Sequence, residues 1–188
     1  KKHINYTKLI CFCDNTLFDD LYLDKKEVFV MLKLCLKFAY QYDYKLVIKT
    51  KKYKSFYKDL MKDNSSIIIE IDDHIGSIQQ YHEKTIFIGY GLFSLGILAL
   101  KQNKLALFFD KYNMIGEEYS SILKNYIIQN EGDLFIKIKD LSKLKFDGNK
   151  NYLSNFINFD KSDGNEKITD YLISYLDNIS SSKEETLD

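Results

Sequence analysis

The amino-acid sequence predicts an α/β fold: a doubly wound, mainly parallel sheet of five to six strands with helices on both faces, the arrangement called Rossmann-like. Short apolar runs alternate with helical segments along most of the chain. Two of the runs, Ile86–Ile88 and Leu105–Phe109, contain no polar residue, which is typical of strands covered on both faces. The chain has 188 residues, 45% of them hydrophobic, so it is large enough for the core of one such domain.

Three strands and two helices are expected in the first part of the chain. The strands are Lys8–Cys13, Lys45–Ile48 and Ser66–Ile71. The first helix runs from Lys25 to about Tyr42, and Asp24 with Glu27 three residues later forms a capping-box pattern at its start. Only Lys33 and Lys37 interrupt its apolar surface, so we expect this helix to be well buried.

The second helix, Tyr53–Met61, is amphipathic, with Phe56 and Leu60 four residues apart. The elements expected next are a short helix within the polar loop 72–84, the strand Ile86–Ile88, the loop Gly89-Tyr90-Gly91, the helix Leu92–Leu100 and the strand Leu105–Phe109.

After Asp110 the pattern is less regular. The expected elements are a helix at Glu117–Ile128, a sixth strand or the start of a helix at Asp133–Ile138, and helices at Asn151–Phe159 and Glu166–Leu176. Together with the preceding strands they form a single predicted domain of residues 1–176, and residues 177–188 form a polar tail.

Composition argues against several classes of function. The 27 acidic residues balance the 27 basic ones, so the chain lacks the basic excess that is usual in nucleic-acid-binding domains. Because every one of these basic residues is a lysine, a phosphate must be held by lysine or backbone N–H groups. Cys11 and Cys13 have no second pair to complete a zinc site, and we expect no metal. No segment is long and apolar enough to be a transmembrane helix.

Right-handed crossovers between parallel strands place all their carboxyl ends at one edge of the sheet, where such sheets bind ligands. Polar and glycine residues at or just after the predicted strand ends are therefore the candidate site. They are Asp14, Asn15, Thr16, Lys49, Thr50, Lys51, Asp72, His74, Gly89, Gly91, Ser94 and Asp110.

Two of these features each have two interpretations. Gly89 and Gly91 either let a diphosphate approach the N-terminus of the following helix or merely allow a tight turn. The place of this loop at the ligand-binding edge favours the diphosphate. Lys49, at the end of a buried strand, either neutralises that diphosphate or reaches solvent. Asp14 and Asp110 are suited to acid–base chemistry, but the sequence does not show whether they meet.

Part of the chain resembles the haloacid dehalogenase-like phosphatases. Phe12-Cys13-Asp14-Asn15-Thr16-Leu17 is similar to their first motif, Thr50 to their second, and Gly89-Tyr90-Gly91 to their last. Phe12, however, stands where these enzymes carry the nucleophilic aspartate, and Tyr90 stands where they carry a metal-binding aspartate. This resemblance implies an inactive relative, a non-catalytic module that acts in protein interaction.

A second resemblance covers most of the chain, from about Lys8 to Leu176. Its pieces are Phe12 to Asn15, Val47-Ile48-Lys49 with Thr50-Lys51, Ile88-Gly89 with Ser94 and Ala99, Asn103 to Asp110, and Phe159 to Ile173. In order and spacing they resemble the C-terminal, donor-binding half of GT-B glycosyltransferases, especially those that build bacterial surface and capsular polysaccharides.

This second resemblance implies a nucleotide-activated sugar or polyol as substrate and no cofactor. The implied donor and phosphate contacts are Lys49, Thr50, Lys51, Gly89, Gly91, Phe93, Ser94 and Asp110, with Asp14, Asn15, Thr16 and His74 as further contacts at the edge. Many of these enzymes carry a glutamate that holds the ribose hydroxyls, and Leu98 occupies that place here.

GT-B enzymes form their active site between two domains, and the acceptor-binding half usually supplies the catalytic base. The resemblance therefore implies an N-terminal acceptor-binding domain missing from this chain, no catalytic residue within it, and no activity of the chain alone. It also implies a cytoplasmic location, the inner face of the membrane included.

Overall fold

The computed structural model describes residues 6–14, 25–50, 53–72 and 78–141. All of them belong to one compact unit, residues 1–148. The helices expected at Asn151–Phe159 and Glu166–Leu176, the tail 177–188 and Asp24 of the expected capping box lie outside the described residues.

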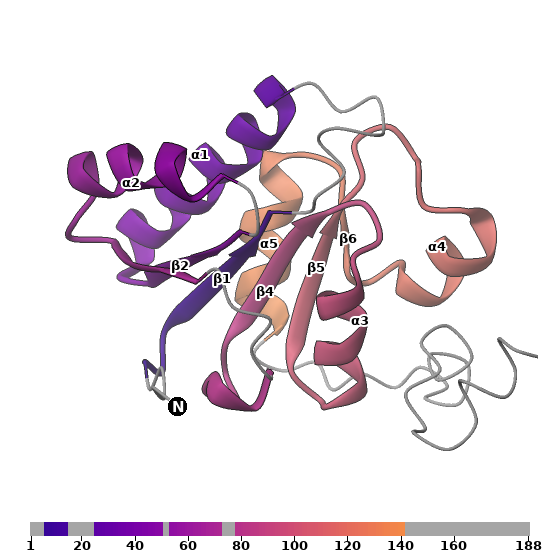
Figure 1. The fold of residues 1–188 in the computed structure, drawn as a ribbon. Helices are drawn as coiled ribbons and strands as arrows, with labels where there is room; N and C mark the ends of the chain where they lie inside the picture. The colour runs from indigo at the N-terminus through magenta and orange to yellow at the C-terminus, as the bar shows by residue number, and fades with distance from the viewer. Residues whose placement is uncertain (1–5, 15–24, 51–52, 73–77, 142–188) are drawn as a thin grey trace, which may run out of the picture. The chain divides into compact units, whose positions relative to one another are not determined.

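The described strands form one six-stranded sheet in which every neighbouring pair is parallel (Figure 1). They are β1 (Leu9–Cys13), β2 (Lys45–Lys49), β3 (Ile68–Asp72), β4 (Ile86–Tyr90), β5 (Leu105–Phe109) and β6 (Ile127–Ile128). The strand order β3-β2-β1-β4-β5-β6 changes direction between β1 and β4, which is the topological switch point of a doubly wound sheet. The predicted fold class is therefore confirmed.

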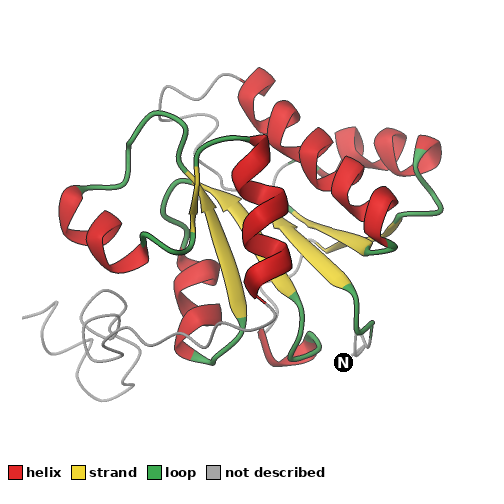
Figure 2. Ribbon diagram, turned by 180° about the vertical axis from the view of Figure 1, so that it is seen from behind, coloured by secondary structure: helices red, strands yellow, loops and turns green. Residues whose placement is uncertain are grey.

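Helices cover both faces of the sheet (Figures 1 and 2). One face carries α1 (Lys25–Tyr42), α2 (Lys54–Asp63) and α5 (Glu131–Leu141), the other carries the 3₁₀ helix η2 (Ile78–Gln80) and α3 (Ser94–Lys101), and α4 (Glu117–Leu123) links β5 to β6. Ring contacts link the helices to one another and to the sheet. The ring centroid of Phe38 in α1 lies 5.5 Å from that of Phe135 in α5, and Phe93, just before α3, lies 5.1 Å from Phe108 of β5.

The strands are apolar because both faces of the sheet are covered. Every residue of β1 and of β4 is buried, and Phe12, Phe87 and Phe108 are among the largest side chains with less than 2% exposure. Full burial of a side chain of this size contributes roughly 1.5–3 kcal/mol. Polar side chains enter the sheet near its carboxyl edge, so the chemistry of the domain is concentrated there.

The strand register decides which residues are neighbours at that edge. The last complete row across all six strands consists of Asp72, Lys49, Cys13, Gly89, Phe108 and Ile127. Residues of one row point to the same face of a sheet, and the contact of Phe108 with Phe93 identifies it as the α3 face. Asp14 and Thr50 belong to the next row and therefore point to the face that carries α1 and α2.

β4 continues two residues beyond the expected end at Ile88. Gly89 and Tyr90 belong to the strand, because Tyr90 still pairs with Phe109 of β5. Of the expected loop Gly89-Tyr90-Gly91, only Gly91 lies in the turn, where its φ of +58° suits a glycine. The expectation that Gly89 is a loop residue is wrong.

The helices of the first half are less completely buried than expected. On α1, 46% of Val30 and 80% of Tyr40 are exposed, because the sheet and α5 leave one side of this helix to the solvent. On α2 the buried residue is Tyr57, whereas Phe56 is 42% exposed. The expectation of a well-buried first helix is therefore wrong, whereas the second helix is amphipathic as expected, with Tyr57 and not Phe56 as its buried ring.

The second half also differs from the expected pattern. The helix expected at Glu117–Ile128 ends at Leu123, and its last two residues form the sixth strand, β6. The segment Asp133–Ile138 is helical and belongs to α5. An N-cap residue explains why this segment is helical. The Asn130 side chain accepts a hydrogen bond from the Asp133 N–H at 3.0 Å and so caps the start of α5.

The ring of Phe93 fills the space above two glycines, and this packing is testable. A Cβ atom added at Gly89 would lie 2.7 Å from the Phe93 ring, and one added at Gly96 would lie 2.5 Å from it. We expect Gly89→Ala to lower the free energy of unfolding by about 1–3 kcal/mol through overpacking. Urea denaturation followed by circular dichroism measures this change.

A double-mutant cycle identifies the cause. In a Phe93→Leu background the added methyl group meets no ring, so Gly89→Ala should cost less there than in the wild type. Gly116→Ala is the control, because a methyl group at this exposed glycine meets no neighbour closer than 3.9 Å. Equal costs of Gly89→Ala in both backgrounds would contradict the packing described here.

Candidate functional site

The candidate site is the carboxyl edge of the sheet around the switch point between β1 and β4. Most of the predicted site residues within the described chain lie at this edge, as their place at strand ends requires. These are Asp14, Lys49, Thr50, Asp72, Gly91, Phe93, Ser94 and Asp110, with Gly89 inside the end of β4. Asn15, Thr16, Lys51 and His74 lie outside the described residues.

Lys49 forms an ion pair on the α3 face of the edge. Its Nζ lies 2.7 Å from Oδ2 of Asp72, and the two side chains are only 16% and 6% exposed. The same Asp72 oxygen accepts hydrogen bonds from Gln80, at 3.3 Å, and from the hydroxyl of Tyr81. Neither sequence interpretation described this arrangement, in which the Lys49 ammonium group pairs with the Asp72 carboxylate. A phosphate at this edge would share Lys49 with Asp72.

Burial and the neighbouring carboxylate also act on Tyr81. Desolvation, the nearby Cys11 and the Asp72 carboxylate raise the pKa of the Tyr81 phenol far above its ordinary value. Lys49 lies 6.0 Å from the centroid of the Tyr81 ring, within reach of a cation–π contact. Tyr81 therefore remains a hydrogen-bond donor at neutral pH and helps to hold the Lys49–Asp72 pair.

Gly89 and Gly91 have different surroundings. Gly89 accommodates the Phe93 ring, so its lack of a side chain serves the core. None of the described residues has an atom within 4 Å of the position that a Cβ of Gly91 would occupy, and the Gly91 N–H donates to the carbonyl of Phe109 at 2.8 Å. Gly91 itself is buried, but among the described residues no side chain packs against it as Phe93 packs against Gly89.

The N-terminus of α3 follows this turn directly. No side chain of the described residues caps the helix at Phe93, and the N–H groups of Gly96 and Ile97 both donate to the Phe93 carbonyl. The N–H groups of the first two helical residues, Ser94 and Leu95, precede these bonds and carry the positive end of the helix dipole. Ser94 is exposed, so this end of the helix faces the surface.

Asp14 lies on the opposite face of the same edge and is 9% exposed. Its Oδ2 accepts a hydrogen bond of 2.8 Å from the Thr50 hydroxyl, and Thr50 in turn accepts one from the Tyr53 N–H at 3.1 Å. Oδ1 of Asp14 is buried and has no hydrogen-bond partner among the described residues. Burial raises the pKa of Asp14 from 3.8 to about 6, although hydrogen bonds with Thr50 and Tyr57 act in the other direction.

Asp110 has a structural role in the loop after β5. Its two carboxylate oxygens accept hydrogen bonds from the N–H groups of Met114, at 2.6 Å, and Ile115, at 3.1 Å. The side chain is 2% exposed and therefore turned inward. Asp14 and Asp110 have separate hydrogen-bond partners, and the residues between Asp110 and Ile115 form a turn that the carboxylate stabilises.

Sequence reasoning missed three residues at this edge. Tyr57 and Tyr81 contribute hydroxyls to Asp14 and Asp72, and Glu27 binds Lys111 at 3.1 Å and the hydroxyl of Tyr112 at 2.9 Å. Glu27 thereby ties the first turn of α1 to the loop after β5. Tyr57 could have been found from its place in the helix after Thr50, but no local pattern indicates the partners of Glu27.

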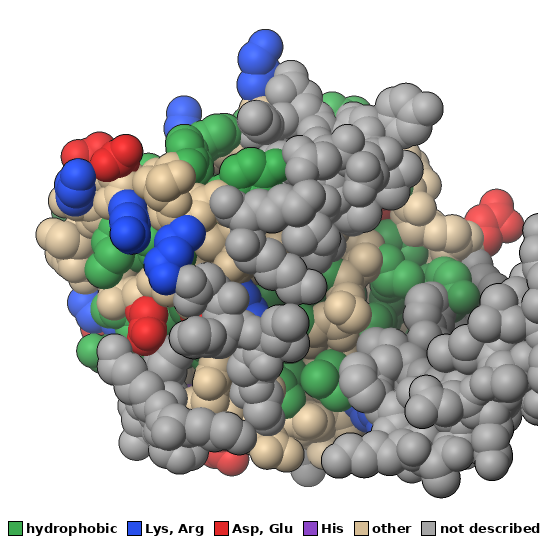
Figure 3. Space-filling view, in the orientation of Figure 1, with side chains coloured by type: hydrophobic (Ala, Val, Ile, Leu, Met, Phe, Trp, Pro, Cys, Tyr) green, Lys and Arg blue, Asp and Glu red, His purple; other side chains and the backbone are tan. Residues whose placement is uncertain are grey.

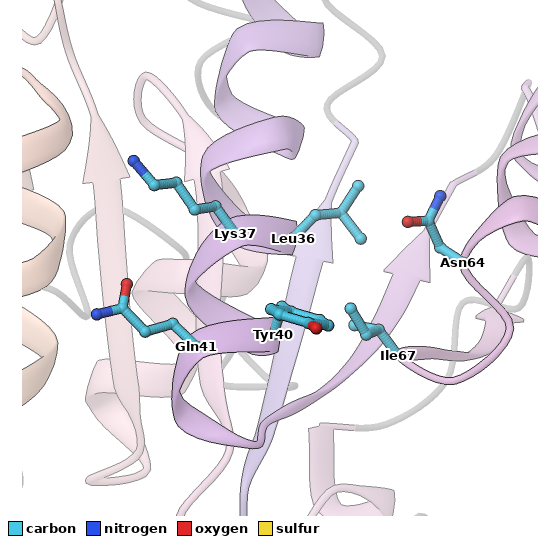
Figure 4. A pocket seen from close by; sticks show the side chains of 6 residues that line it. All are labelled: Leu36, Lys37, Tyr40, Gln41, Asn64 and Ile67. Atoms are coloured by element: carbon cyan, nitrogen blue, oxygen red, sulfur yellow. The ribbon is translucent and has the colours of Figure 1, made fainter.

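A shallow groove lies away from this edge. Its lining comes from the second half of α1 and from the connection between α2 and β3, as Figure 4 shows. The lining residues are Leu36, Lys37, Tyr40, Gln41, Asn64 and Ile67, around a volume of about 520 Å³. Because Ile67 immediately precedes β3, the groove lies toward the amino ends of the strands, opposite the candidate site.

Charges of both signs are mixed on the surface. In the space-filling view, lysine and acidic side chains alternate over the part of the described surface formed by α1 and α2 (Figure 3). Among the described residues, no three His, Cys, Asp or Glu side chains are placed to hold a metal ion. None of the described helices combines the length and apolarity that crossing a bilayer requires.

The raised pKa of Asp14 predicts a pH dependence of stability. The folded state keeps the Asp14 proton up to about pH 6 and the unfolded state only up to 3.8, so the folded state binds more protons between these values. The contribution of Asp14 is therefore fully present below pH 3.8 and is lost as pH rises through 6. We expect Asp14→Asn to remove this slope, measured by urea denaturation across the window.

Thr50→Val is the matched control for this measurement. It keeps the carboxylate but removes a hydrogen bond that lowers the pKa of Asp14, so the loss of stability should extend to higher pH. If wild type and Asp14→Asn have the same profile, Asp14 does not have the environment described here.

Comparison of the chain with protein-family models, with curated proteins and with solved structures finds no match.

Proposed function

We propose that this chain is the donor-binding domain of a GT-B glycosyltransferase that uses a nucleotide-activated sugar or polyol in surface polysaccharide biosynthesis. The observation that carries the proposal is the turn at Gly91, where a Cβ atom would meet none of the described residues within 4 Å, leading into an N-terminus of α3 that no described side chain caps, beside the switch point of the sheet. Open parallel sheets bind ligands at this place, and a helix N-terminus attracts phosphate. The ordered series of motifs that resembles the GT-B donor-binding half agrees with it.

In this proposal the diphosphate of the donor binds at the N–H groups of Ser94 and Leu95. These groups keep their positions during transfer, so they would stabilise the negative charge that grows on the leaving nucleotide. The hydroxyl of Ser94, the first residue of α3, would add one hydrogen bond to the diphosphate. Lys49 contributes charge to the same edge, but its pairing with Asp72 makes it a weaker contact than its position in the sequence predicts.

The acceptor and the catalytic base belong to a second domain in this proposal. The strand-end residues of the described edge are engaged in structural bonds, with Asp110 in its loop and Thr50 with Asp14. Asp14 has an unpartnered oxygen, but it lies on the face opposite α3. The proposed role of this chain is therefore binding and orientation of the donor, with cytoplasmic nucleotide-sugars as its substrates.

A second candidate function is a non-catalytic module related to the haloacid dehalogenase-like phosphatases. The bond between Thr50 and Asp14 joins the two positions that resemble the first and second motifs of that family, which favours this candidate. Phe12, in the place of the nucleophile, is fully buried and offers no carboxylate. Such a module would act through protein contact, and the groove at Leu36, Tyr40 and Ile67 offers apolar surface for it.

Ser94→Glu separates the two candidates. A carboxylate in the first turn of α3 suits the helix dipole and should not lower stability. It would repel a bound diphosphate, since two unit charges about 5 Å apart interact by roughly 3 kcal/mol at an effective dielectric constant of ~20. Calorimetric titration with uridine, cytidine and guanosine diphosphate donors should show binding to the wild type and an affinity at least about 10-fold lower for Ser94→Glu.

Ser65→Glu is the control for the added charge. Ser65 is exposed in the turn before β3, at the amino edge of the sheet, and its substitution should leave donor binding unchanged. The donor-binding proposal fails if no donor class binds the wild type, or if the two glutamate variants bind the donor equally well. The first of these results would favour the non-catalytic module.

A further inference from the structure

We propose that Asp14 accepts a hydrogen bond from a hydroxyl group of the bound donor, through its Oδ1 atom. This inference rests on the proposed donor-binding function and extends it to a part of the ligand other than the diphosphate. It assigns to Asp14 the recognition of a neutral hydroxyl, from the ribose or from the transferred sugar or polyol.

The first argument is the unequal environment of the two carboxylate oxygens. Oδ2 receives the Thr50 hydroxyl at 2.8 Å, and Thr50 is itself held by the Tyr53 N–H. This chain of bonds fixes the carboxylate at the end of β1. Oδ1 therefore has a fixed direction as well, although none of the described residues forms a hydrogen bond with this atom.

The second argument is the free energy of an unpartnered buried oxygen. Asp14 is 9% exposed, so water does not freely solvate Oδ1. A buried acceptor without a donor destabilises a fold by about 1–3 kcal/mol, and by more when it is charged. Such an atom in a protein calls for an explanation, and a ligand donor at a ligand-binding edge provides one. The raised pKa of Asp14 has the same origin, since burial disfavours its charge.

The third argument is the position of Asp14 in the sheet. It follows Cys13, the last residue of β1, and β1 lies directly beside β4 at the switch point. The turn at Gly91 follows β4 at the same edge. Asp14 and Gly91 therefore follow the carboxyl ends of two neighbouring strands. Asp14 points to the α1–α2 face and α3 lies on the other face, which separates the carboxylate from the proposed diphosphate position.

The chemistry of the site selects a hydroxyl as the partner. A carboxylate repels phosphate, so the diphosphate is not the group that Asp14 holds. A metal ion needs more than one such oxygen, and the described residues provide no group of three metal ligands. A hydroxyl donates one hydrogen bond to one oxygen, which matches the single unpartnered atom of Asp14.

The test measures binding by calorimetry at about pH 7.5, where Asp14 is ionised. The probes are UDP, CDP and GDP, each alone and as a complete donor: UDP-glucose, CDP-glycerol and GDP-mannose. In Asp14→Asn the Thr50 hydroxyl still finds an oxygen, but the ligand hydroxyl then faces a neutral NH₂ group and must accept instead of donate, so the hydrogen bond to a charged oxygen is lost. We expect the affinity for the complete donor to fall about 10-fold or more, the effect of one hydrogen bond to a charged group.

Comparison of the nucleoside diphosphates with the complete donors identifies which part of the ligand carries the hydroxyl. A loss that is already present with the nucleoside diphosphate assigns Asp14 to the ribose, and a loss confined to the complete donor assigns it to the transferred group. Asp63→Asn, an exposed aspartate at the end of α2, is the matched control and should bind all probes as the wild type does.

Two results overturn the inference, and they differ in their meaning. If the wild type binds a complete donor and Asp14→Asn binds it equally well, Asp14 contacts no ligand, and a buried water satisfies Oδ1. If the wild type binds none of the probes, the donor-binding function fails and the inference falls with it. Thermal unfolding of Asp14→Asn in the absence of ligand verifies that the variant is folded when its affinity is measured.

Discussion

The parallel register of a sheet covered on both faces governs the structure and the candidate site. Because β1 and β4 are buried on both sides, their residues are apolar until the strands end. The polar groups that follow are brought together at one edge, where burial requires each of them to find a partner. The pair Lys49–Asp72 and the bond from Thr50 to Asp14 are two solutions to this requirement. Oδ1 of Asp14 is an exception, since no described residue forms a hydrogen bond with it, and the further inference rests on this atom.

The two faces of this edge have different chemistry. On the α3 face, Phe93 closes the sheet over Gly89, and the amides at the start of α3 supply positive potential beyond it. On the other face, a carboxylate with a pKa of about 6 stands beside two hydroxyl side chains. An anionic group and a hydroxyl-bearing group can therefore bind at one edge without competing for the same protein atoms. A nucleotide-activated sugar carries both kinds of group.

Much of the fold could be predicted from local patterns. The apolar run Leu105–Phe109 and the helix Lys25–Tyr42 have the predicted bounds, because hydrophobic periodicity and strand-end polar residues are visible within a short window. The partner of Lys49 could not be predicted, since Asp72 is 23 residues away and their pairing depends on the register of β2 and β3, which shifts between Leu46 and Val47. The role of Gly89 depends likewise on the ring of Phe93, which packs back over the sheet.

The most direct test of the account is to locate the bound donor by NMR. In a titration of the ¹⁵N-labelled chain with UDP-glucose, CDP-glycerol and GDP-mannose, the account predicts that one of them shifts the amide signals of Gly91, Ser94 and Leu95. The signals of Asn64 and Ile67, at the amino edge, should stay in place. Shifts confined to the groove at Leu36, Tyr40 and Ile67, or no shifts with any of the three donors, would contradict it.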